Sequence, residues 1–129
     1  MPAPRFTALP FFVYPVTDML RARTFYEGVL GLSITANWEN KWVEFDIGTG
    51  TLALSSVMDG CTPGARGAAA ALEAENFDAA VTWLREHGVE FVFAPHDTSV
   101  CHFARFLDPD GNHLVLHRKH TDWERNASG

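Results

Sequence analysis

The segment VTDMLRARTFYEGVLGL, residues 16–32, decides the fold of the first half of this 129-residue chain. Asp18 offers a carboxylate that can accept hydrogen bonds from the free N–H groups of a first helical turn. Apolar residues then recur at the spacing of one helix face, namely Ala22, Phe25, Tyr26, Val29 and Leu30. Gly31 can end the helix in the left-handed conformation. The segment therefore predicts a helix that begins after Asp18 and ends at Gly31.

Strand-like segments surround this predicted helix. A strand rich in Phe and Val precedes it, and three short strands follow, with a tight turn between the last two. The predicted strands are residues 9–16, 32–38, 41–47 and 51–56, and the turn is residues 48–50. The first half therefore has the order βαβββ.

The second half repeats this order. Asn76 is the next candidate N-cap, Gly88 closes the second helix, and the turn DPDG at residues 108–111 precedes the last strand. The helix face is predicted to carry Phe77, Ala80, Trp83, Leu84 and His87. The predicted strands are residues 67–75, 89–94, 100–107 and 113–118.

Fixed offsets relate the two halves. Asp18, Ala22 and Phe25 precede Asn76, Ala80 and Trp83 by 58 residues, and Asp46, Leu52 and Leu54 precede Asp108, Leu114 and Leu116 by 62. We therefore predict an α+β fold of two tandem βαβββ modules within one domain. The modules span residues 6–57 and 67–118, a Gly- and Pro-rich linker spans 58–66, and a polar tail spans 119–129.

Composition narrows the class of protein. A hydrophobic fraction of 47% with ten Phe and four Trp is enough for a core, and the net charge of −6 argues against nucleic acid as a partner. No apolar run approaches the roughly 20 residues that span a bilayer. Neither a signal peptide nor a metal-type cysteine cluster is visible, and Cys61 and Cys101 read as free thiols. We expect a cytoplasmic protein with no membrane association.

Two stretches carry a resemblance to a known family. Residues 16–32, with their FY and LGL signature, resemble the first helix of the vicinal oxygen chelate superfamily, which contains glyoxalases, bleomycin resistance proteins and dioxygenases. FLDPDGNHLVL at residues 106–116 resembles the DPDGN turn and closing strand of that superfamily. The resemblance covers nearly the whole chain. It implies that the modules form a curved, barrel-like mixed sheet around a cleft, and that the chain pairs as a homodimer.

The resemblance also places a metal site. In metal-using relatives, His, Glu or Gln from the first and last strand of each module hold a divalent ion, because such ions need imidazole or carboxylate donors. The matching positions here are Phe11, Ala53, Ala69 and Val115. All four side chains are apolar. We therefore expect that the family metal site is lost and that no divalent metal serves as cofactor at these positions.

Polar residues near these positions are candidates for a displaced site. Residues two apart on a strand share a face, so His113 and His117 flank Val115. If the apolar face of the strand at 41–47 packs on the helix, Glu44 faces the same cleft. His102 joins them only if its strand, which does not alternate cleanly, turns it to that side. We favour the interpretation that the histidines are solvated polar residues at the mouth of the cleft.

The ligand contacts expected on this basis form one set. They are Phe11, Trp42, Glu44, Ala53, Ala69, Phe106, His113, Val115 and His117. The apolar members and the Trp42 and Phe106 rings would suit a planar ligand. The net negative charge of the chain would weakly favour a cationic ligand.

Three functions are compatible with these residues. The first is a metal-free protein that binds a small aromatic or cationic molecule. The second is an enzyme of lyase, isomerase, thiol transferase or dioxygenase type, with a relocated metal or with Glu44, His113 or His117 as acid–base groups. The third is a regulatory or scaffolding module, which no feature specifically supports. Metal analysis separates the metal-free interpretation from a relocated metal site, since fold alone does not establish activity.

Overall fold

The chain divides into two compact units, and the boundary along the sequence falls between Cys61 and Thr62. The structure, a computed structural model, describes residues 3–5, 7–58, 61–64 and 68–120. Residues 59, 60, 65 and 66 of the predicted linker and residues 121–129 of the predicted tail lie outside the described residues.

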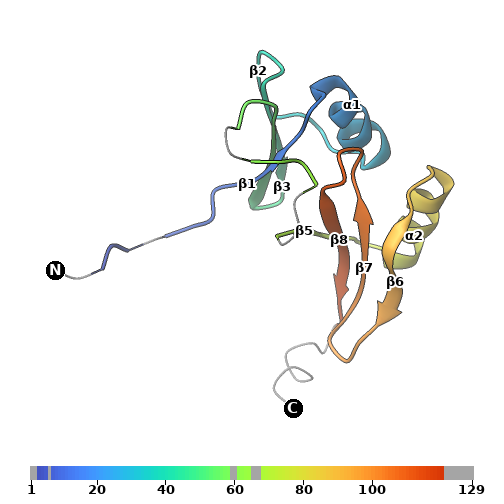
Figure 1. Ribbon diagram of the computed structural model, residues 1–129. Helices are drawn as coiled ribbons and strands as arrows, with labels where there is room; N and C mark the ends of the chain where they lie inside the picture. Colours follow the sequence, from blue (N-terminus) through green and yellow to red (C-terminus); the bar gives the residue numbers. More distant parts are fainter. Residues whose placement is uncertain (1–2, 6, 59–60, 65–67, 121–129) are drawn as a thin grey trace. The chain divides into compact units, whose positions relative to one another are not determined.

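The first unit is one four-stranded mixed sheet with one helical segment (Figure 1). Its strands are β1 (Phe12–Pro15), β2 (Ala36–Trp38), β3 (Trp42–Ile47) and β4 (Gly50–Ser55), and its helical segment consists of α1 (Met19–Arg23) and the π-helix η1 (Thr24–Val29). The strands lie in the order β1-β4-β3-β2, and β1 runs parallel to β4.

The second unit repeats this plan. Its strands are β5 (Ala70–Glu73), β6 (Phe91–Asp97), β7 (Cys101–Leu107) and β8 (His113–Lys119), and its helix is α2 (Phe77–Glu86). The order is β5-β8-β7-β6, with β5 parallel to β8. The predicted α+β class and the repeated βαβββ order are therefore confirmed, and each sheet has two edge strands rather than closing on itself.

Both helical segments begin and end at the predicted residues. The Asp18 carboxylate accepts a hydrogen bond from the Arg21 N–H at 3.1 Å, and the Asn76 side chain accepts one from Ala79 at 3.0 Å. Gly31 and Gly88 have φ angles of +70° and +78°, the left-handed region that glycine adopts at low cost. The first segment differs from the prediction in its last turn, where the Leu30 N–H bonds to the Phe25 carbonyl five residues back, a π-helical pattern.

One side of each sheet packs against the helix of its own unit. In the first unit the Tyr26 ring stacks on Phe45, with centroids 6.1 Å apart, and both residues are fully buried. In the second unit Phe77, Val81 and Leu84 are the buried residues of α2. The predicted helix face is corrected here, because Trp83 is 49% exposed and Val81 takes its place in the core.

The two turns that precede the last strand of each unit differ by one residue. Asp46 pairs with Thr51 across the first turn, with four residues between them, and Leu107 pairs with His113 across the second, with five. The predicted match of Asp46 with Asp108 is therefore wrong by one position. Strands β3 and β7 correspond at an offset of 61 residues, so that Phe45 matches Phe106.

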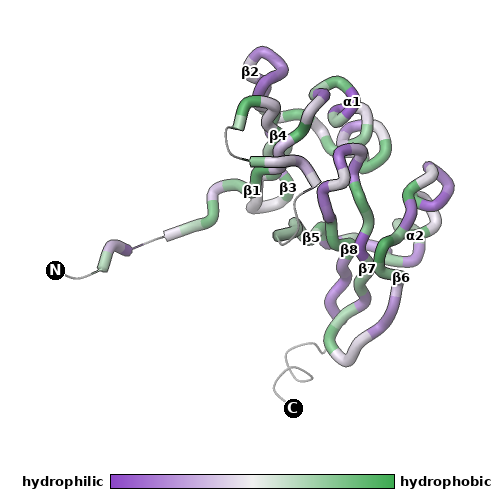
Figure 2. Tube along the Cα trace, in the orientation of Figure 1, coloured by the Kyte–Doolittle hydropathy of each residue, from purple (hydrophilic) through white to green (hydrophobic). Residues whose placement is uncertain are grey.

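The β2–β3 turn was not predicted. Glu39 and Asn40 both have positive φ angles, 54° and 55°, and the Lys41 N–H donates to the Trp38 carbonyl at 2.9 Å. The turn is hydrophilic, whereas β3 carries hydrophobic residues (Figure 2). Among the described residues, no helix is long and apolar enough to cross a membrane.

Candidate functional site

The side of the first sheet that faces away from the helix carries several predicted ligand contacts. Val13, Ala53 and Glu44 lie side by side on β1, β4 and β3. The flanking residues on β3, Val43 and Phe45, are fully buried. Because neighbours on a strand point to opposite faces, Glu44 and Ala53 share the face opposite the helix. We call this the helix-distal face of the first sheet. Glu44 lies on it, and the predicted cleft shared with His113 and His117 stays a prediction.

An aromatic pair and a carboxylate meet on this face. The Trp42 indole N–H donates to Glu44 Oε2 at 2.8 Å. The Phe11 ring meets the Trp42 ring edge-on, with centroids 5.4 Å apart and an interplanar angle of 88°. Phe11 is 46% exposed, while Trp42 and Glu44 are half-buried. The arrangement can hold a flat apolar group against the rings and a positive group at the carboxylate.

The helix-distal face of the second sheet contains the other predicted residues. His113, Val115 and His117 are partly exposed, whereas the alternating Leu114 and Leu116 are buried. The predicted common facing of the two histidines is confirmed.

Glu73 on β5 was not among the predicted site residues. It lies beside His117 in the β5–β8 ladder, and its carboxylate is hydrogen-bonded to the His117 Nδ1. Its other oxygen accepts the Lys119 N–H at 2.9 Å. Partial burial acts to raise the pKa of Glu73, but these hydrogen bonds and the nearby positive charges outweigh it and hold that pKa below its ordinary value. Only the parallel pairing of β5 with β8 brings these residues together, and the local sequence carries no signal for it.

Aromatic residues extend this second face. Phe103 lies beside His117 in the β7–β8 ladder. The Phe103 ring stacks on Phe93 with centroids 5.2 Å apart, and the His96 ring lies 4.0 Å from it. The Arg105 guanidinium carbon lies 5.5 Å from the centroid of the Phe93 ring. This aromatic group was also missing from the sequence prediction, because β6 contains register irregularities that interrupt simple alternation.

Two predicted residues lie on the opposite side of the second sheet. Phe106 is fully buried, pairs with Leu114 and contacts the Phe91 ring, so it is a core residue and not a ligand contact. His102 stacks on Phe77 of α2, with centroids 5.4 Å apart, and therefore faces the helix. His102 cannot join His113 and His117, which point to the other face.

The four positions that the resemblance assigns to metal ligands do not fit a metal. Phe11, Ala53, Ala69 and Val115 have only carbon in their side chains. Ala53 is also fully buried, while Phe11 and Ala69 lie just before β1 and β5. Divalent ions in proteins require nitrogen, oxygen or sulfur ligands. We therefore derive no chemistry through a metal at these positions.

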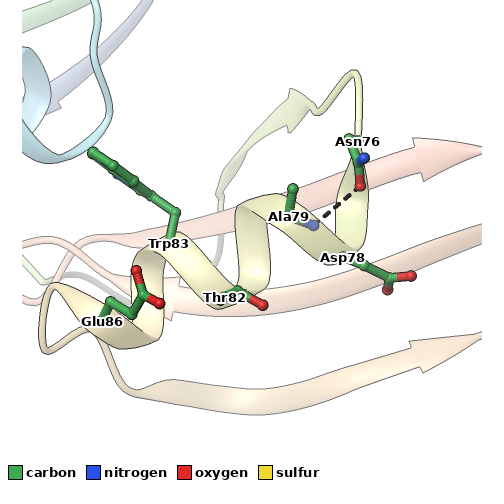
Figure 3. Close-up of a pocket in the computed structure, with 6 residues that line it drawn as sticks. All are labelled: Asn76, Asp78, Ala79, Thr82, Trp83 and Glu86. Carbon is green, nitrogen blue, oxygen red and sulfur yellow. Dashed lines mark hydrogen bonds between the residues drawn. The ribbon is translucent and has the colours of Figure 1, made fainter.

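A separate surface depression of about 480 Å³ runs along α2. Its lining residues are Asn76, Asp78, Ala79, Thr82, Trp83 and Glu86. Asn76 is engaged as the helix N-cap, and the other side chains fan outward without converging on one point (Figure 3). No predicted site residue lies in this depression.

Comparison with known proteins agrees with the repeated fold. The family model of the glyoxalase/bleomycin resistance protein/dioxygenase superfamily matches residues 8–116. The chain belongs to this superfamily. Among curated proteins, none matches the chain.

Solved structures of superfamily members are similar over most of their length. TnmS3, an antibiotic binding protein from Streptomyces sp. CB03234, has a TM-score of 0.77 at 25% identity, covering 92% of this chain and 100% of that one. A glyoxalase/bleomycin resistance protein from the same strain has a TM-score of 0.72 at 26% identity, covering 86% and 100%. A lactoylglutathione lyase from Agrobacterium tumefaciens has a TM-score of 0.70 at 20% identity, covering 88% and 95%, and this likeness shows the fold alone.

Proposed function

We propose that this superfamily member is a metal-independent binding protein for a small, planar, cationic molecule. The observation that carries the proposal is the cluster of Phe11, Trp42 and Glu44 on the helix-distal face of the first sheet. The edge-to-face aromatic pair offers ring faces on which a planar group can stack, and the carboxylate beside it stabilises a positive charge. The similarity to an antibiotic binding protein supports a binding role.

The absence of donor atoms at the four family positions supports the metal-free part of the proposal. Phe11 belongs both to that set and to the aromatic pair, so the residue that replaces a ligand also forms part of the binding surface. We further propose that the chain acts in the cytoplasm as a homodimer. Exposed apolar side chains such as Trp38 and Leu20 are available for pairing. Sedimentation equilibrium measures this association directly.

A matched set of variants tests the binding proposal. The probe is 9-aminoacridine, a planar cation, and 9-anthracenecarboxylate is an anion with a similar ring system. We expect calorimetric binding of the cation only, unchanged by EDTA. Glu44→Gln should weaken it about tenfold, equivalent to about 1.4 kcal/mol, because the charge opposite the cation is lost.

Arg105→Gln is the control, since Arg105 occupies on β7 the place that Glu44 occupies on β3. This variant should bind the cation as the unchanged protein does, or slightly more tightly. Equal binding of both probes, or full affinity in Glu44→Gln, would contradict the proposal. Loss of binding after EDTA treatment would contradict its metal-independent part.

A second candidate function rests on the Glu73–His117 pair. A carboxylate that orients an imidazole is the arrangement of many general bases. The second function is therefore acid–base catalysis on the helix-distal face of the second sheet, with His117 as the base. A turnover that is abolished by His117→Gln and unaffected by Glu44→Gln would favour this enzyme over the binding protein.

A further inference from the structure

Three potential metal ligands meet at one end of the second sheet. Asp97 ends β6, His102 lies near the start of β7, and His120 follows β8. One ligand atom from each of these side chains lies within 4.8 Å of the others. The sequence does not predict this cluster, because its members are separated by up to 23 residues and meet only through strand pairing.

The distances suit a shared ion. His120 Nε2 lies 2.6 Å from Asp97 Oδ1, and His102 Nδ1 lies 3.7 Å from the same oxygen. Two ligands bound tetrahedrally to one transition metal at about 2.0–2.2 Å are separated by about 3.4 Å. The observed separations lie on either side of that value, so small side-chain rotations bring the three atoms to coordination distance.

The backbone holds the three residues in place. Asp97 and His102 are direct partners in the β6–β7 ladder, and the His120 N–H donates to the Val100 carbonyl at 2.8 Å. The Thr98 hydroxyl accepts the N–H groups of Val100 and Cys101 and so stabilises the turn between β6 and β7. An ion would therefore bind to a site that folding has already assembled.

Side-chain packing also orients the imidazoles. The His102 ring stacks on Phe77, and the His120 ring lies 4.8 Å from the His102 ring. All three ligand side chains keep partial exposure, 38% for His102, 59% for Asp97 and 29% for His120, so an ion can enter from solvent.

We propose that Asp97, His102 and His120 bind one divalent transition-metal ion such as Zn²⁺, Ni²⁺ or Co²⁺. Two imidazoles and one carboxylate are ligands that these ions accept, and water fills the remaining positions. The ion takes the place of the hydrogen bonds that His120 Nε2 makes with Asp97 Oδ1 and the Thr98 carbonyl, and it joins β6, β7 and the segment after β8. This site lies on the helix side of the sheet with His102, away from His113 and His117, and is independent of the proposed binding function.

The test uses the full chain without a polyhistidine tag, stripped with EDTA and dialysed. Titration calorimetry with Zn²⁺ should show one site, and the midpoint of thermal unfolding should rise with Zn²⁺ concentration. Loss of an outer-shell partner typically lowers metal affinity about 10- to 100-fold. Removal of a direct ligand in Asp97→Asn, His102→Gln or His120→Gln should lower it at least as much.

His117→Gln is the matched control, because it removes another carboxylate-paired histidine from the opposite face of the same sheet. It should bind Zn²⁺ with unchanged affinity. Far-ultraviolet circular dichroism of each metal-free variant establishes that it folds. The cobalt form adds a second measurement, since visible Co²⁺ absorption should disappear in His102→Gln and persist in His117→Gln.

Two results would overturn the proposal. One is the absence of Zn²⁺ binding at millimolar concentration, which would leave a hydrogen-bonded cluster only. The other is unchanged affinity in folded His102→Gln and His120→Gln, which would place the ion elsewhere.

Discussion

On the helix-distal face of the first sheet, Glu44 lies beside Ala53, and at the matching place in the second sheet Arg105 lies beside Val115. The two units share strand order and pairing, yet this position carries opposite charges. On the helix side the matching residues are instead all apolar: Phe45 and Phe106 are identical, and Val43 matches Ala104. Packing against the helix therefore keeps the core positions apolar in both units, whereas the helix-distal faces differ in chemistry.

The next pair of residues on each helix-distal face also differs in chemistry between the two sheets. Trp42 pairs with Ser55 in the first sheet, while Phe103 pairs with His117 in the second. An aromatic residue is present in both sheets, but only the second has a histidine, and Glu73 lies beside it where the first sheet has Pro15. The carboxylate beside an aromatic ring makes cation binding the candidate role of the first face, and the paired histidine makes proton transfer that of the second.

The largest effect is expected from the matched core residues. Phe45→Ala and Phe106→Ala should each reduce the free energy of unfolding by about 3–5 kcal/mol, because each leaves a large cavity beside a helix. Urea denaturation followed by circular dichroism measures the change. The face variants Glu44→Gln and Arg105→Gln should stay within about 0.5 kcal/mol. A cost below about 1 kcal/mol for Phe106→Ala would contradict its assignment to the core.

Sequence patterns predict where the helices and strands lie, and for several strand residues they also predict the face of the sheet that carries the side chain. The N-caps Asp18 and Asn76 and the left-handed glycines act locally, so their roles can be read from a few neighbouring residues. Strict alternation in β8 likewise gave the facing of His113 and His117. These predictions succeed because the relevant physics is confined to one turn or one strand.

The errors arise where distant pairing decides the outcome. Phe106 is predicted as a ligand contact but pairs with the buried Leu114, which places it in the core. The facing of His102 cannot be predicted from sequence, because β7 does not alternate cleanly in apolar character, and the structure turns it toward Phe77 of α2. Glu73 was missed because its partner His117 lies 44 residues away in sequence. One-residue differences in turn length reverse the face on which a side chain lies.

The turns before the last strand of each unit should show the next largest difference in stability. Asp108 is 5% exposed, and its carboxylate accepts the N–H groups of Asp110 and Asn112 and the Asn112 side-chain amide at 2.8–2.9 Å. Asp46 is exposed and accepts the Thr51 hydroxyl at 2.9 Å. Asp108→Ala should therefore cost about 2–3 kcal/mol of unfolding free energy, and Asp46→Ala less than about 0.5 kcal/mol. Chemical denaturation measures both, and similar costs would show that the two turns are equivalent after all.

The two helix N-caps should contribute nearly equal amounts to the stability of their units. Asp18→Ala and Asn76→Ala each remove one side-chain acceptor from a first helical turn, and each should cost about 1 kcal/mol. Hydrogen exchange of the Arg21 and Ala79 amides reports the loss at each cap separately. A much larger cost at Asp18 would indicate that the short α1 segment depends on its cap more than the ten-residue α2 does.

The smallest effect is expected for the Glu73–His117 pair of the second sheet, whose matching positions in the first sheet are Pro15 and Ser55. The pKa of Glu73 is held below its ordinary value, because its hydrogen bonds with His117 and the Lys119 N–H and the nearby positive charges outweigh the opposing effect of partial burial. A carboxylate with a lowered pKa stabilises the fold above its ordinary pKa, and this contribution disappears as the pH falls through the folded value.

Glu73→Gln should therefore be less stable than the unchanged protein at neutral pH, by no more than about 1 kcal/mol because the pair is exposed. The difference should shrink as the pH falls through the lowered pKa of Glu73. Urea denaturation at a series of pH values measures it, with Glu75→Gln as a control for loss of a nearby exposed carboxylate. If both variants respond alike to pH, the pairing of Glu73 with His117 contributes nothing to stability, and the His117 imidazole is not oriented by that carboxylate in solution.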